Sequence, residues 1–169
     1  FTLTAPVTNA FRFEPMPARA YLPAFSAEQL SSGRRKFEFL SVNCSNLVLT
    51  SKRIEPANFV HALRAYGSYG STRRAVTAAP LDLNVVPGQT VLTRRFDRRP
   101  PVDQPIRDEL DWTTLLGGKQ HGTAIIETEN RLSGDEYART STSVAQTLIQ
   151  LTDLGLIWKR GEGQMFVWC

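Results

Sequence analysis

The sequence predicts an α+β fold built from two small units, an N-terminal αβ unit and a C-terminal unit that is mostly β with an inserted helix. Two observations predict this class. Apolar residues at helical spacing alternate with segments rich in Val, Leu and Thr, and a proline-rich stretch separates two halves. The chain of 169 residues is 41% hydrophobic and 21% charged, which is typical of one globular domain or two small ones.

Composition divides the chain into four segments. Residues 1–25 contain four prolines and no sustained helical or strand period, so we expect an irregular extension. Residues 26–97 form the predicted N-terminal αβ unit. Residues 98–105 are expected to be a stiff linker, because their prolines lack the donor that a strand needs. Residues 106–169 form the C-terminal unit, with the helical insertion around 140–158.

A first helix is predicted to begin at Ser26. Ser26 and Gln29 fit a capping box, in which the serine accepts from the amide three residues on and the glutamine reaches back. The apolar residues that follow share one helical stripe, and they are Leu30, Phe37, Leu40, Cys44 and Leu47. We therefore expect Cys44 to fill the core rather than to react as a thiol.

A second helix is predicted to begin at Pro56 and to end at Gly67. Proline is tolerated in a first turn because its missing N–H would have no partner there, and glycine commonly follows a last turn. The expected apolar side carries Phe59, Leu63 and Tyr66. His61 lies off that side, so a surface histidine is expected.

The other predicted elements are mainly strands. Residues 75–86 and 89–96 are rich in Val, Leu and Thr and are divided by Pro87-Gly88, which predicts a hairpin. A short helix is expected around 106–116. Strands are expected at 123–128 and 164–168.

Positive charge is concentrated in the first part of the chain. Residues 1–106 contain 14 Lys and Arg against 7 Asp and Glu, whereas residues 107–169 contain 6 against 9. The basic residues form four short runs, Arg34-Arg35-Lys36, Arg73-Arg74, Arg94-Arg95 and Arg98-Arg99. Any single run is also what a solvated surface carries, but four runs of mostly arginine favour a polyanionic partner such as nucleic acid.

The composition disfavours an enzyme. Cys44 and Cys169 lack the CxxC spacing of a zinc site, and His61 and His121 lie far apart. The loop 117–122 does not match GxxxxGK[ST], because Lys119 is followed by glutamine. We expect no catalytic residue, no metal and no cofactor. No apolar stretch approaches the roughly 18 residues of a membrane-spanning helix, so no membrane contact is expected.

One interpretation of the C-terminal half is a winged helix-turn-helix. Residues 133–139, 144–154 and 158–168 scan as helix, recognition helix and β-wing, which is the outline of a DNA-binding domain. The predicted recognition helix 141–154 contains no Lys or Arg and one Asp, so it is a poor reader of DNA. This interpretation is kept as the alternative.

A second interpretation rests on a family resemblance. Gly122–Arg139 begins Gly-Thr-Ala-Ile, and Gly161–Trp168 begins Gly-Glu and ends Val-Trp. These stretches are similar to the universal small-subunit ribosomal protein number eight, whose signature runs Gly-Ile-Ala-Ile, a Ser-Thr-Ser loop, an Asp-x-Glu-Ala-Arg-like helix, Gly-Glu and Val-Trp. Residues 40–47 and 56–70 resemble its first two helices more weakly, and Val86-Pro87-Gly88 resembles its Ser-Lys-Pro-Gly-Leu-Arg element. The similarities follow the family's order along most of the chain.

The departures from that signature define a subgroup. Glu127-Thr128-Glu129 stands where the family has Ser-Thr-Ser, so two carboxylates would face RNA at that loop. The extension 1–25 and the insertion 140–160 are additions to the family core. Such additions resemble mitochondrial members, which implies a location in the mitochondrial ribosome of the matrix, with the cytoplasm as the alternative.

The resemblance implies a structural constituent of the small ribosomal subunit. Its expected function in translation is to bind the central domain of the small-subunit rRNA and support its assembly, next to neighbouring small-subunit ribosomal proteins. RNA duplexes are recognised mainly through phosphates and 2′-hydroxyls. The expected phosphate contacts are Arg34, Arg35, Lys36, Lys52, Arg53, Arg73 and Arg74. The expected contacts to hydroxyls or base edges are Asn43, Asn46 and Thr128.

Overall fold

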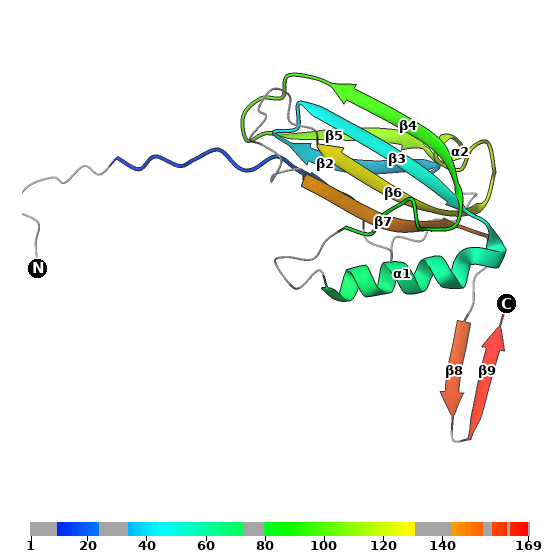
Figure 1. The fold of residues 1–169 in the computed structure, drawn as a ribbon. Coiled ribbons are helices and arrows are strands. Elements are labelled where there is room, and N and C mark those ends of the chain that lie inside the picture. The colour runs from blue at the N-terminus through cyan, green and yellow to red at the C-terminus, as the bar shows by residue number, and fades with distance from the viewer. Residues whose placement is uncertain are drawn as a thin grey trace, which may run out of the picture.

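Two antiparallel sheets face one another across a shared core (Figure 1). The computed structural model describes residues 10–23, 34–72, 80–130, 143–153, 157–161 and 163–168. Sheet A has the strand order β1 (Arg19–Tyr21), β2 (Lys36–Val42) and β5 (Pro105–Asp111). Sheet B has the order β4 (Gln89–Asp97), β3 (Asn46–Ile54), β6 (Gly122–Asn130) and β7 (Ser143–Leu151).

Within the described residues, the other elements are a 3₁₀ turn, two α-helices and a hairpin. Helix α1 (Phe59–Thr72) follows a 3₁₀ turn at Pro56–Asn58, and α2 (Trp112–Leu115) is a single turn. Strands β8 (Ile157–Gly161) and β9 (Gln164–Trp168) pair as a hairpin. The predicted α+β class is confirmed only in that helices and strands both occur, because the protein is mostly β, with two antiparallel sheets.

Both sheets draw strands from either side of residues 98–105. Strand β2 pairs with β5 in sheet A, and β3 pairs with β6 in sheet B. Residues 98–104 form the loop between β4 and β5, and Pro105 begins β5. The hydrogen bonds of the sheets therefore join the two units that the sequence analysis separated.

Alternate residues of β2 and β3 fill the core between the sheets. In β2, Phe37 and Phe39 are almost fully buried, and in β3 Leu47 and Leu49 are fully buried. This period of two is the signature of a strand with one face turned inward. Cys44 belongs to the same cluster, so the prediction that it fills the core is confirmed.

Helix α1 covers the outer face of sheet B as a third layer (Figure 1). Ile54, Ile125 and Leu148 come from three neighbouring strands and pack with Ala62 of the helix. The predicted apolar side of the helix is confirmed, since its three residues pack on this cluster, namely Phe59, Leu63 and Tyr66. His61 is exposed as expected, whereas Gly67 lies inside the helix, where a glycine costs only about 1 kcal/mol.

The predicted first helix was wrong over its described part. Residues 36–42 and 46–54 are strands, and the start at Ser26 lies outside the described residues. The helical stripe through Phe37, Leu40 and Leu47 arose by coincidence of spacing. It left out Phe39 and assigned Leu40 to the core, although Leu40 is 37% exposed.

The predicted helical insertion was also wrong where it is described. Residues 143–151 are strand β7, which pairs with β6 along its whole length. Leu148 packs under α1 while Ile149 faces the other sheet, so both faces of β7 are buried. Because both faces of β7 are buried, and buried Gln146 and Thr147 interrupt its apolar residues, the segment lacks the alternation of apolar and polar residues that would identify a strand.

The other predicted strands are confirmed in part. Residues 123–128 lie in β6, 164–168 form β9 and 89–96 lie in β4. Strand β4 pairs with β3 rather than with a strand before Pro87, and residues 80–86 contain no strand. The segment 106–116, expected to be a helix, is β5 followed by α2. Asp111 caps the start of α2, because its carboxylate accepts a hydrogen bond from the Thr113 amide.

Arg98 joins the two sheets at the end of β4. Its guanidinium donates to both carboxylate oxygens of Asp108 in β5 at 2.9 and 2.8 Å, and to Ser41 Oγ in β2 at 2.5 Å. It also lies 5.6 Å from the centre of the Phe96 ring. The charged pair is largely buried, with 18% of the arginine side chain and 15% of the aspartate side chain exposed.

Candidate interaction surface

Residues 10–17, here called the arm, form an extended segment that precedes β1 in the chain and projects away from the body of the protein (Figure 1). Phe11 and Phe13 on the arm are 79% and 87% exposed. The two exposed rings lie on one short segment, separated in sequence by Arg12 alone. Adjacent exposed aromatic rings mark an interaction site more often than scattered apolar residues do.

A polar cluster, here called the clamp, holds the base of the arm. The Asn43 amide nitrogen donates to Asp103 Oδ1 and to the carbonyl of Met16, both at 2.7 Å. The backbone N–H of Asp103 donates to Asn43 Oδ1, and that of Met16 donates to Asp103 Oδ1, both at 2.8 Å. Both polar groups of the Met16 backbone are thus bound, which fixes where the arm leaves the sandwich.

The clamp residues hold an unfavourable backbone conformation. Asn43 has φ 55° and Asp103 has φ 60°, and they are the described non-glycine residues with positive φ. Such conformations cost about 1–3 kcal/mol each, and asparagine and aspartate tolerate them best. Asn43 is the first residue of the turn between β2 and β3, and Asp103 lies in the β4–β5 loop. Two separate loops therefore carry strain at one contact.

Replacing Asn43 tests the clamp. Asn43→Gly keeps the left-handed backbone but removes the side-chain hydrogen bonds, so the amide order parameters of residues 10–16 should fall while stability changes little. Asn43→Ala should release the arm equally and lower the free energy of unfolding by about 1–2 kcal/mol more, because a Cβ disfavours positive φ. NMR relaxation and chemical denaturation measure the two effects. An arm that stays ordered in both variants would contradict the assignment.

A cavity of about 520 Å³ lies at the opposite end of sheet B from the clamp. Its apolar lining includes Ile54, Phe59 and Leu151. Its rim carries both signs of charge, from Arg53, Glu55 and Lys119. His121 also lines it and lies 2.7 Å from the carboxylate of Asp153.

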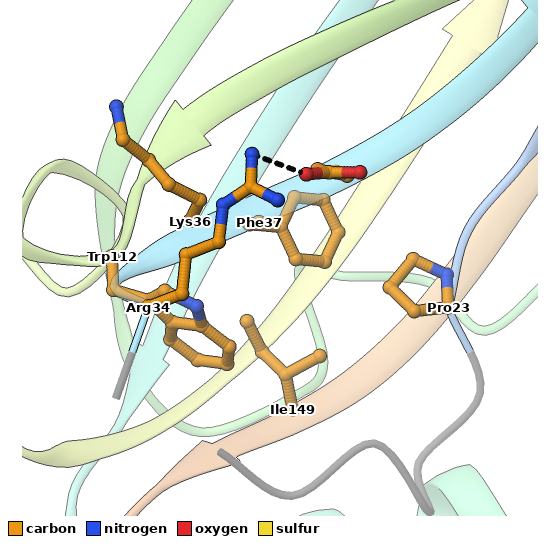
Figure 2. Close-up of a pocket in the computed structure, with 7 residues that line it drawn as sticks. Pro23, Arg34, Lys36, Phe37, Trp112 and Ile149 are labelled. Atoms are coloured by element: carbon orange, nitrogen blue, oxygen red, sulfur yellow. Dashed lines mark ion pairs between the residues drawn. The ribbon is translucent and has the colours of Figure 1, made fainter. Parts of the chain in front are cut away.

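A second cavity, of about 300 Å³, opens between the sheets beside β2 (Figure 2). Figure 2 shows Phe37, Trp112 and Ile149 around its interior and Pro23 on the opposite side. Arg34 lies across it and pairs with Glu38 at 2.8 Å. Trp112 is 1% exposed, and its buried indole N–H has no acceptor among the residues that the structure describes.

The outer face of sheet B holds a partly buried carboxyl. Gln146 donates to Glu127 at 2.5 Å, which favours the charged form. Burial nevertheless raises the pKa of Glu127, and the nearby carboxylates of Glu129 and Asp82 act in the same direction. Lys52, on the same face, donates to the Leu83 carbonyl at 2.6 Å.

Glu127 should make stability depend on pH. A pKa raised by folding stabilises the protein below the unfolded value, near 4.3, and this contribution is lost as pH rises through the folded pKa. Glu127→Gln should therefore be more stable than the parent at neutral pH, and the difference should vanish towards acid pH. Chemical denaturation across this range measures it. Parallel profiles for the two proteins would contradict the prediction.

Those residues predicted to contact RNA that the structure describes do not form one surface. Several of the predicted cations are paired with carboxylates: Arg34 with Glu38 and Glu109, Lys36 with Glu109, and Arg53 with Glu55. Arg35 donates to the Gln120 carbonyl, and Lys52 is buried. Asn43 belongs to the clamp, Asn46 accepts from Arg95, and Thr128 is fully buried. Arg73 and Arg74 lie outside the described residues.

Two findings concern the predicted absence of a metal and of a membrane contact. Within the described ranges, no group of three His, Cys, Asp or Glu side chains is placed to hold a metal ion. The helices in that part of the chain are too short or too polar to cross a membrane. The arm itself was predicted only as an irregular extension, although the Phe-x-Phe spacing at 11 and 13 was present in the sequence.

Comparison with known proteins assigns the fold. The chain has the architecture of a macroglobulin-like β-sandwich. It is similar to a crystal structure of native alpha-2-macroglobulin from Escherichia coli spanning domains NIE to MG1, with a TM-score of 0.60 and 16% identity over 90% of this chain and 68% of that one. It is also similar to the cryo-EM structure of the native conformation of that protein, with a TM-score of 0.51 and 15% identity over 85% of this chain.

The second of these matches covers only 8% of the alpha-2-macroglobulin chain. No family model matches this chain, and no curated protein matches it significantly. The likeness therefore concerns the fold.

These findings correct the functional interpretation of the sequence. The resemblance to the ribosomal family was wrong, because the fold that matches is a β-sandwich. Segments that carried the resemblance also differ in secondary structure from what the ribosomal family implied. Residues 40–47 are strand and turn rather than a helix, and the expected RNA loop at Thr128 lies within strand β6. The DNA-binding alternative fails as well, since its recognition helix is β7. The expected rRNA partner and mitochondrial location lose the resemblance that supported them.

Proposed function

We propose that this chain is a non-catalytic β-sandwich module that binds another protein through its arm. The observation that carries the proposal is the pair of exposed rings, Phe11 and Phe13, on a segment whose base, Met16, is held by two hydrogen bonds from the clamp. Exposing two phenyl rings to water is unfavourable by about 1.5–3 kcal/mol for each ring relative to burial. A partner that covers them recovers this free energy.

The clamp supports the same proposal. Fixing Met16 removes conformational freedom from the base of the arm before any partner arrives, which lowers the entropy cost of binding. Strain held at Asn43 and Asp103 is typical of functional segments. The fold likeness adds that similar sandwiches occur as domains of a larger protein, alpha-2-macroglobulin.

Photo-crosslinking tests the proposal. Benzoylphenylalanine is placed at position 13 of the full chain, which is then irradiated in an extract of the source cells. We expect discrete protein adducts from position 13. Val102 is the matched control, since it is also an apolar residue with a largely exposed side chain, at 67%, but lies off the arm.

Two outcomes would contradict the proposed function. One is the absence of any adduct from position 13. The other is an equal set of adducts from positions 13 and 102, which would show that exposure alone governs the reaction. Adducts specific to position 13 support it, and mass spectrometry then identifies the protein to which the arm binds.

A further inference from the structure

The arm and the larger cavity lie at opposite ends of the sandwich. Strand β3 follows the turn of Asn43 in the clamp, and its last residue, Ile54, lines the cavity. Nine strand residues span about 30 Å. Phe11 is five residues from Met16 and reaches at most about 18 Å from the clamp. The arm therefore cannot fill the cavity of its own chain.

The two surfaces match in chemistry. The cavity offers an apolar interior, from Ile54 and Phe59, and a volume of about 520 Å³, which is ample for an aromatic side chain. The arm offers aromatic rings at positions 11 and 13, which flank Arg12 and are followed by Glu14.

Charge complements this apolar match. At the rim, the ammonium of Lys119 is placed to pair with Glu14 of the arm, whereas the carboxylate of Glu55 already pairs with Arg53 of its own chain at 2.8 Å. Complementary charges of this kind fix orientation more than they add affinity.

We propose that the arm of one copy of this chain inserts Phe13 into the cavity at the far end of a second copy. The inference rests on the proposed function, because it names the protein that the arm binds. Each copy contributes a different surface, so the contact is head-to-tail and can repeat from copy to copy. The surface buried by one short arm lies below the roughly 1,200 Å² of a stable interface, so association should be weak and depend on concentration.

Sedimentation velocity of the full chain, over a concentration series up to the millimolar range, tests the inference with two complementary variants. Phe11→Ala/Phe13→Ala removes the rings but keeps the cavity. Gln150→Trp places an indole in the cavity, from a half-buried position on β7, but keeps the arm. Val102→Ala is the matched control. Near-UV circular dichroism checks folding, and Lys119→Glu, at an exposed position on the rim, replaces Gln150→Trp if that variant does not fold.

The expected pattern is specific to head-to-tail contact. The parent chain and Val102→Ala should associate as concentration rises, whereas each arm or cavity variant alone should bind itself at least tenfold more weakly. An equimolar mixture of the two variants should form a one-to-one dimer and nothing larger. Each dimer then has one intact arm and one intact cavity, joined in a single contact.

Three results would overturn the inference. They are a parent chain that stays monomeric throughout, variants that associate as the parent does, or a mixture that forms no dimer. If the parent is monomeric but position 13 still gives specific adducts to another protein, the self-association fails and the proposed function stands. If both experiments are negative, both proposals fail.

Discussion

Arg98→Met should lower the free energy of unfolding by about 3–5 kcal/mol, the typical cost of removing one partner of a buried ion pair. The substitution leaves the Asp108 carboxylate largely buried between the sheets without its two hydrogen bonds from the guanidinium. It also removes the hydrogen bond to Ser41 and the contact with the Phe96 ring. Chemical denaturation measures the loss.

Two controls separate burial from charge. Arg95 pairs with Asp97 at a similar distance, 2.9 Å, but both side chains are more than half exposed, so Arg95→Met should cost less than about 1 kcal/mol. The double variant Arg98→Met/Asp108→Leu removes both charges and should recover most of the loss. Equal losses for Arg95→Met and Arg98→Met would contradict the role assigned to burial.

Trp112→Ala should cost about 3–5 kcal/mol, the range for large aromatic residues in a core. Trp112 is 1% exposed, and its ring meets Phe37 edge-on at 6.3 Å between centres. It begins α2, directly after β5, so its loss opens a void where the two sheets meet. Thermal or chemical denaturation measures the effect.

Trp112→Phe is the matched control. It shortens the ring but removes an indole N–H that is buried without an acceptor, and such a donor costs about 1–3 kcal/mol. We therefore expect Trp112→Phe to lose much less stability than Trp112→Ala. A phenylalanine variant as unstable as the alanine variant would show that the N–H has a role that the structure does not explain.

The sequence predicted those elements in which apolar and polar residues fall on opposite sides. Helix α1 was predicted because one side carries Phe59, Leu63 and Tyr66 while His61 is exposed. Strand β6 was predicted from a short β-branched run. Strands β2 and β7 were missed for two different reasons. A chance helical spacing through Phe37 and Leu40 hid the alternation in β2, and burial on both faces removed the alternation from β7.

The interaction surface could be predicted only in part. Residues 1–25 were expected to be irregular, and the described residues 10–18 contain no helix or strand. The prediction was wrong for Arg19–Tyr21, which form strand β1 and place Ala20 in the core. The clamp could not be found, because Asn43 and Asp103 meet only when the β2–β3 turn and the β4–β5 loop are brought together by sheet pairing. Asn43 was selected for an RNA contact, and its local sequence gives no indication of Met16 as its partner.

The pairing of distant strands in both sheets has a consequence for the rate of folding. Lys36 pairs with Asp111 in sheet A, and Leu47 pairs with Asn130 in sheet B. Contacts between residues so far apart in sequence must close long loops before they stabilise anything, and domains dominated by them fold in milliseconds to seconds rather than microseconds. During synthesis, β3 has only β4 as a partner until β6 leaves the ribosome, so sheet B completes late, and its hydrophobic inner face stays exposed to solvent until then.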